Sequence, residues 1–181
     1  MAYLQSLGPQ GTLLDLFRLF PETSKPIIEY HEALLRSPSP FTEAERELIA
    51  AYVSGLNHCR YCHAIHTATA ERLGVGEGLV PRLVEQLETA DAPEKMKPVL
   101  RCARKLTERP DSIHQSDLEA ILAAGWDETA VYHTVAVTAL FNFMNRLVEG
   151  LGIEFNPAYT KEASQRLADG GYLPLLRMMG R

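Results

Sequence analysis

A short stretch of the sequence, "HCRYCHAIH" at residues 58–66, places two cysteines and three histidines within nine positions. Thiolates act as nucleophiles and metal ligands, and an imidazole can serve as a base or as a ligand. The spacing Cys59-x-x-Cys62 is typical of a metal site or a working dithiol when the compartment is reducing. Redox chemistry, metal binding and plain core packing are therefore the three uses to weigh.

Helical geometry favours the redox interpretation. If a helix begins near His58, the side chains of Cys59, Cys62 and His66 fall within an arc of about 60° and share one face. The His66 ring then leans toward the Cys62 thiol, because helical side chains point toward the N-terminus. Both thiols would lie in the first turn, where the helix dipole favours anions, so we expect a lowered thiol pKa.

The same residues support metal binding and core packing less well than redox chemistry. A zinc ion needs four ligands, and His58 or His63 could complete a set with the two cysteines. Ligands from one helical face would crowd one side of a tetrahedral ion, and the sequence has no second C-x-x-C, so we expect no metal. Cys102 stands apart from the other two cysteines and is expected to be a small buried hydrophobe.

The rest of the chain must position these groups, and its pattern predicts an all-α protein. Apolar residues recur at i, i+3, i+4 and i+7, and no window alternates with period two. A chain of 181 residues is most simply one domain. We expect helices at 12–20, 24–36, 43–57, 58–74, 77–87, 93–108, 116–124, 128–150 and 160–168. The apolar tail "GGYLPLLRMMGR" is expected to dock on its own domain or on a neighbouring subunit.

Glu47 precedes the cysteines on the preceding predicted helix. On one continuous helix it would lie about 18 Å from Cys59, so the break at residues 55–57 must fold the two helices into a hairpin for the groups to meet. Glu47 shares a stripe with the small residues Ala44, Ala51 and Ser54. Its sequence context alone favours a solvated surface charge.

Four other polar residues are weaker candidates for the site. Asn142 and Arg146 lie one turn apart in an apolar helix, where they could line a pocket, hold a subunit contact or form a structural network. We expect the structural network. His133 is expected to pack in the same helix, and His63 to have a structural role beside the cysteine face.

Charge and composition exclude several classes of protein. A net charge of −5 and the absence of a basic cluster argue against nucleic-acid binding. The N-terminus has no cationic start followed by an apolar run, which predicts a cytoplasmic protein. The longest apolar run, "VAVTALF" at residues 135–141, is too short to span a membrane, so we expect no membrane partner. No flavin or nicotinamide fingerprint is present, and we expect no bound cofactor.

The pattern Glu47-x11-Cys59-x-x-Cys62-x-x-x-His66 resembles the active-site signature of the carboxymuconolactone decarboxylase-like superfamily, and within it the AhpD-like alkylhydroperoxidases of the peroxidase-related branch. The stretches "FTEAERELIAAYVSGLNHCRYCHAIH" and "FNFMNRLVEGLGI" are typical of that branch. The resemblance is strong over residues 38–75 and weaker up to 153. It implies an AhpD-like helical bundle with a helix-hairpin core over about 38–153. Segments 1–36 and 157–181 would pack on that core or on a neighbouring subunit.

The resemblance also implies roles for these residues. Cys62 would be the peroxidatic nucleophile, Cys59 would resolve the sulfenic acid as a disulfide, and His66 and Glu47 would relay protons. A hydroperoxide substrate, an external thiol or disulfide reductant protein and a homo-oligomer are implied as partners. One position departs from the family: Tyr61 stands where active peroxidases can have a histidine, which removes one proton carrier.

The sequence thus predicts a dithiol-dependent, peroxidase-related oxidoreductase that reduces hydroperoxides. Two alternatives stay open. One is a thiol-disulfide exchanger or decarboxylase-type enzyme on the same fold. The other is a metal-binding or structural oligomeric protein.

Overall fold

The computed structural model describes residues 2–180, which form ten α-helices, three short 3-10 turns and no strand. The predicted all-α class is confirmed; of the predicted span 1–181, Met1 and Arg181 lie outside the described residues. The helices are α1 (Leu13–Leu19), α2 (Pro21–Arg36), α3 (Glu43–Leu56), α4 (Arg60–Arg72), α5 (Leu79–Gln86), α6 (Lys97–Glu108), α7 (Gln115–Ala123), α8 (Glu128–Gly150), α9 (Pro157–Gly170) and α10 (Leu173–Met179).

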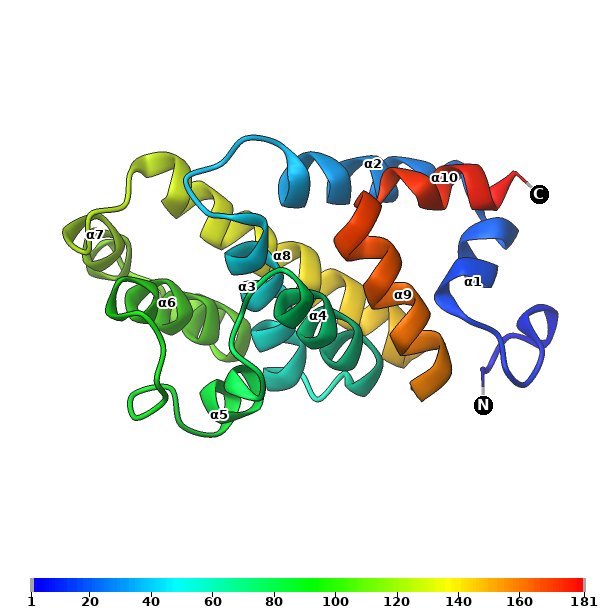
Figure 1. Ribbon diagram of the computed structural model, residues 1–181, viewed down its shortest axis with the longest axis horizontal. Coiled ribbons are helices and arrows are strands. Elements are labelled where there is room, and N and C mark those ends of the chain that lie inside the picture. The colour runs from blue at the N-terminus through cyan, green and yellow to red at the C-terminus, as the bar shows by residue number, and fades with distance from the viewer. Residues whose placement is uncertain (1, 181) are drawn as a thin grey trace.

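The centre of the molecule is the α3–α4 hairpin, whose two helices lie side by side in Figure 1. Helix α8, the longest, packs against α3, and α9 packs against α4. Helices α5, α6 and α7 lie at one end, and α1, α2 and α10 gather at the other end with both chain termini (Figure 1). No helix within residues 2–180 is both long and apolar enough to cross a membrane.

Several helix starts follow directly from local chemistry. The capping box predicted at Thr42 is present: its hydroxyl accepts from the Glu45 N–H at 3.2 Å, and the Glu45 carboxylate accepts from the Thr42 N–H at 2.8 Å. Thr12 and Asp15 cap α1 in the same way. Helix α2 begins at Pro21, three residues before the prediction, because proline has a suitable φ and needs no hydrogen-bond acceptor at the first helical position.

The turn between α3 and α4 corrects a predicted boundary. The helix expected from His58 begins at Arg60, and Cys59 is its N-cap. His58 takes a left-handed backbone, with φ 57°, and its N–H donates to the carbonyl of Gly55 at 3.0 Å. The Cys59 N–H donates to the Ser54 carbonyl, also at 3.0 Å. This compact turn closes the hairpin and leaves only the second cysteine inside the helix.

The apolar tail is helix α10, which packs against α1 and α2. Glu32 of α2 holds its start, because one carboxylate oxygen accepts from the Tyr172 N–H at 2.7 Å and the Leu173 N–H at 3.3 Å. Gly171 allows this approach: it has φ 66°, and a Cβ there would lie 2.7 Å from that oxygen. The contact fixes the position of Tyr172, whose hydroxyl reaches the candidate site.

Candidate active site

Glu47 is the most completely enclosed charge in the site. It is fully buried, and its Oε2 lies 2.7 Å from the Nδ1 of His66. Its Oε1 accepts from the Nη2 of Arg36 at 2.6 Å and from the hydroxyl of Tyr172 at 2.8 Å. The solvated surface charge that sequence context favoured is therefore wrong. The hairpin brings Glu47 to His66, and helix α2 and the N-cap residue of α10 supply its other two partners.

The pKa of Glu47 is lowered despite this burial. Burial alone raises the pKa, but the charges and hydrogen bonds of His66 and Arg36 outweigh it and lower the value to about 2. The carboxylate is ionised at neutral pH and can only accept hydrogen bonds, so the Nδ1 of His66 is the donor. In the neutral ring the proton then sits on Nδ1, and Nε2 is a free acceptor.

The two sulfur atoms form the other half of the site. Cys59 is 0% exposed and Cys62 is 3% exposed, and both are free thiols. The neighbouring Cys59 thiol, followed by burial, raises the pKa of the Cys62 thiol well above its usual value. The lowered pKa expected from a helix N-terminus is wrong for Cys62, because this thiol is dehydrated and has a second thiol as its neighbour. Ionisation of Cys62 therefore needs a base.

A polar network next to the cysteines partly opposes the rise in the Cys62 pKa. The Asn145 side chain on α8 neighbours Cys62 and acts to lower the thiol pKa. The Nδ2 of Asn145 also donates to the hydroxyl of Ser54 at 3.0 Å, and its Oδ1 accepts from Asn57 at 3.0 Å. Asn145 is 1% exposed, so both bonds hold its amide in one orientation.

A cavity of about 70 Å³ opens beside these side chains. Both Cys62 and His66 line it, whereas Cys59 and Glu47 do not. Most of the wall is apolar and comes from α1, α2, α4, α8, α9 and α10; the remaining lining residues are Leu13, Leu14, Phe17, Ile28, His31, Tyr61, Ile65, Phe141, Met144, Tyr159, Ala163, Arg166, Leu167, Tyr172 and Leu175. The cavity thus gives access to one sulfur of the pair and to the imidazole next to it.

The sequence pattern does not indicate four residues that lie around the site: His31, Arg36, Arg166 and Tyr172. His31 is buried with its ring 5.1 Å from the Tyr172 ring, and its Nδ1 lies 2.8 Å from the Ile27 carbonyl. Burial lowers the pKa of His31 to about 4, so it is neutral at neutral pH. No spacing in the sequence links these residues to the cysteines, because they come from α2, α9 and α10.

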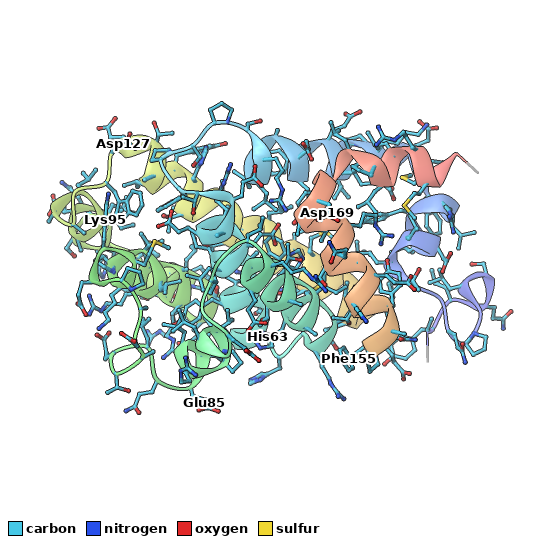
Figure 2. All side chains as sticks on the ribbon, in the orientation of Figure 1. His63, Glu85, Lys95, Asp127, Phe155 and Asp169 are labelled. Atoms are coloured by element: carbon cyan, nitrogen blue, oxygen red, sulfur yellow. The ribbon has the colours of Figure 1, made fainter. Side chains whose placement is uncertain are left out.

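The other polar candidates lie away from the cavity. His63 bonds to the Ala51 carbonyl at 2.9 Å, near the α5 end of the hairpin (Figure 2). His133 bonds to the Ser39 hydroxyl at 2.7 Å, and Arg146 bonds to Asn142 at 2.8 Å. These are the structural roles expected for them.

Cys102 is 2% exposed, as expected for a small buried hydrophobe. Burial raises the pKa of its thiol to about 11. Within residues 2–180, no three or more His, Cys, Asp and Glu side chains gather in an arrangement that could hold a metal ion.

Comparison with known proteins supports the fold. The sequence model of the Carboxymuconolactone decarboxylase family matches residues 21–105, which contain the α3–α4 hairpin and both site cysteines. An uncharacterized peroxidase-related protein from Silicibacter sp. TM1040 is 26% identical with a TM-score of 0.76, and the match covers 82% of this chain and 78% of that one. No protein of curated function gives a significant match.

Two further solved structures share the fold. An uncharacterized peroxidase-related protein from Ralstonia eutropha JMP134, described as an alkylhydroperoxidase AhpD core, is 24% identical with a TM-score of 0.74, over 82% of this chain and 78% of that one. A protein of unknown function from Agrobacterium tumefaciens, described as a putative antioxidant defence protein AhpD, is 16% identical with a TM-score of 0.70, over 78% of this chain and 95% of that one. The resemblance to the carboxymuconolactone decarboxylase-like superfamily, and to its AhpD-like helical fold, is confirmed.

Proposed function

We propose that this protein is a dithiol peroxidase in which Cys62 attacks a hydroperoxide, Cys59 resolves the product, and His66 with Glu47 moves the protons. One observation carries the proposal: the cavity reaches Cys62 and His66 but not Cys59 or Glu47. A nucleophile must meet its substrate, whereas a resolving thiol must meet only the oxidised nucleophile. Cys59 is buried and does not line the cavity, which fits the role of a resolving thiol.

The first step is the removal of a proton from Cys62. Its raised pKa makes the neutral thiol the resting form, so a base must act when substrate is present. His66 lies on the same helix face, and its free Nε2 can take the proton while Glu47 stabilises the resulting imidazolium. Arg36 and Tyr172 hold the carboxylate in place for this task.

The sulfur chemistry then balances in two steps. The Cys62 thiolate attacks the distal oxygen of R–O–O–H and breaks the O–O bond, giving Cys62–S–OH and an alkoxide, which His66 protonates to the alcohol. The Cys59 thiol next displaces the hydroxyl from that sulfenic acid, which leaves as water, and the Cys59–Cys62 disulfide forms. An external thiol or disulfide reductant protein supplies two electrons to restore both thiols.

The setting proposed for this cycle is the cytoplasm, where reduced thiols are available. We assign the whole chain to one AhpD-like domain that works as a homo-oligomer, with the flanking segments packed on its core. Tyr61, in place of the histidine that active peroxidases can have, stacks on Tyr159 at 5.9 Å and lines the cavity. It offers no second base near neutral pH, because burial raises its pKa well above the usual value.

The direct test is to treat the reduced protein with an alkyl hydroperoxide and to map its thiols by mass spectrometry. We expect a loss of about 2 Da confined to the peptide that contains Cys59 and Cys62. Cys62→Ser should abolish peroxide consumption, whereas Cys59→Ser should allow Cys62 to over-oxidise. Cys102→Ser is the matched control for a buried cysteine outside the site and should behave as the wild type.

Two results would reject the peroxidase. Both thiols could persist in excess peroxide, or Cys62→Ser and Cys59→Ser could each cause equal and partial losses of peroxide consumption. Disulfide exchange without peroxide consumption would instead support a thiol-disulfide exchanger on the same fold.

A further inference from the structure

Arg166 is the one cation among the residues that line the cavity, apart from the two imidazoles, and it lies at the rim. It is half-buried, as are its rim neighbours Leu13, Tyr159 and Leu175, whereas Cys62 and His66 lie on the buried floor. Helix α9 aims it inward, since Tyr159, Ala163 and Arg166 are spaced along one helical face and all three line the cavity. The cavity therefore has a thiol at its floor and a guanidinium at its rim.

The Arg166 guanidinium has no partner within residues 2–180. Its Nε is buried without a hydrogen bond, and no ion pair joins it to Glu162 or Asp169, the acidic residues one turn before and after it on α9. The carboxylate of Asp169 instead accepts from Gln165 at 2.7 Å, and Asp169 lies on α9 in Figure 2.

Arg166 differs in this respect from other partly buried arginines. Arg36, Arg46 and Arg104 also have a buried Nε without a hydrogen bond. Each of them uses another guanidinium nitrogen: Arg36 bonds to Glu47, Arg46 to the Leu34 and Ser37 carbonyls, and Arg104 to the Val84 carbonyl. Arg166 is half-buried and uses none of its guanidinium nitrogens within residues 2–180, so its guanidinium is available to an anion from outside the chain.

We propose that Arg166 binds the carboxylate of the substrate, which is an organic acid that carries a hydroperoxide on a short alkyl chain. A single guanidinium offers a two-pronged bond to a monoanionic carboxylate. The cavity of about 70 Å³ is about half the size of a cavity of roughly 150 Å³ that holds benzene, so only a short alkyl segment fits inside. The peroxide end lies at Cys62 and the carboxylate lies at the rim. The inference rests on the proposed peroxidase function.

The kinetic test compares a tert-alkyl hydroperoxide of a branched hexanoic acid with its methyl ester, which lacks the negative charge. We expect the wild type to prefer the acid by about tenfold in kcat/KM, because a charge-assisted bond is lost in the ester. Arg166→Met should remove the preference, because kcat/KM for the acid should fall to the value for the ester. Arg166→Lys should keep part of the preference. Arg177→Met, at an exposed arginine on α10 that does not line the cavity, should keep all of it.

A binding measurement separates this inference from the peroxidase itself. Hexanoate, which has no peroxide, should bind the reduced wild-type protein in calorimetry, and Arg166→Met should weaken that binding about tenfold. If no hydroperoxide is consumed but hexanoate binds through Arg166, the peroxidase fails and the carboxylate site stands. Equal kcat/KM for acid and ester in an active wild type, or hexanoate binding that Arg166→Met leaves unchanged, would overturn the carboxylate site.

Discussion

His66 bonds to Glu47 and lies one helical turn after Cys62, and burial acts to raise the pKa of both the Glu47 carboxyl and the Cys62 thiol. At Glu47 the cation Arg36 and the imidazole of His66 reverse the effect, and the pKa falls to about 2. At Cys62 a thiol neighbour adds to the effect, and a single amide from Asn145 opposes it. The same degree of burial therefore gives a fixed anion in one place and a neutral acid in the other.

This difference gives the two groups different roles: Glu47 holds a permanent negative charge, and Cys62 is the group that reacts. A carboxylate with three partners keeps its charge and orients the imidazole, while the sulfur that faces the apolar cavity stays protonated at rest. In the proposed cycle His66 takes the proton of the Cys62 thiol and so converts the neutral thiol into the reactive thiolate. Substitutions at Glu47 and at Asn145, the amide next to Cys62, should therefore change the properties of the protein by different amounts. His31, a third buried titratable group, tests the effect of burial on a pKa.

The largest effect is expected at the carboxylate. Glu47→Gln keeps the shape but removes the anion that orients and stabilises His66, so peroxide reduction should fall by about 100-fold or more. The free energy of unfolding should also fall, by about 3–5 kcal/mol, because Arg36 is buried and loses its closer and only buried counter-ion. Stopped-flow peroxide consumption and denaturant unfolding measure the two effects.

Two further variants separate an effect of Glu47 on catalysis from an effect on folding. Glu43→Gln removes the other carboxylate beside Arg36, at 3.4 Å, but this carboxylate is 44% exposed and does not bond to His66, so activity should stay near the wild-type level. The pair Arg36→Met with Glu47→Gln removes the unpaired cation and should regain stability without regaining activity. Recovery of activity in the pair would argue that Glu47 serves only the fold.

A smaller effect is expected on the sulfur side. Asn145→Ala removes the amide that lowers the Cys62 pKa, so the thiolate fraction near pH 7 should fall, and alkylation by iodoacetamide should slow about tenfold. Asn142→Ala is the matched control, since Asn142 bonds to Asn57 and Thr107 in the same region. If both variants slow alkylation equally, the network positions the helices and does not act on the thiol.

The last prediction concerns stability and pH and leaves the peroxide chemistry aside. Burial lowers the pKa of His31 to about 4 from an ordinary value near 6.5, so the folded state holds it neutral where the unfolded chain is protonated. Its contribution is complete above pH 6.5 and is lost as the pH falls from there toward 4, by an amount on the order of 3 kcal/mol. His31→Gln should flatten that part of the stability profile, measured by denaturant unfolding between pH 7 and pH 4. An unchanged slope would assign the acid sensitivity to other groups.

The sequence was most informative where the determining contacts are local. The capping box at Thr42 and Glu45 and the shared face of Cys62 and His66 depend on residues within four positions of one another, and the structure contains both. The start of α4 was misplaced, because His58 takes a left-handed backbone that periodicity does not reveal. The tail was recognised as apolar, but its helix depends on contacts with α1 and α2.

The amino-acid sequence by itself determined the all-α class, the cysteine helix and the set of chemical groups at its start, because helix periodicity and spacing act over a few residues. Only the tertiary structure decided that Glu47 is buried against Arg36 and Tyr172, that Cys62 rather than Cys59 meets the cavity, and that Arg166 stands at its rim. Burial and pairing depend on helices that are distant along the chain, and these two properties set whether a buried acid is ionised or neutral.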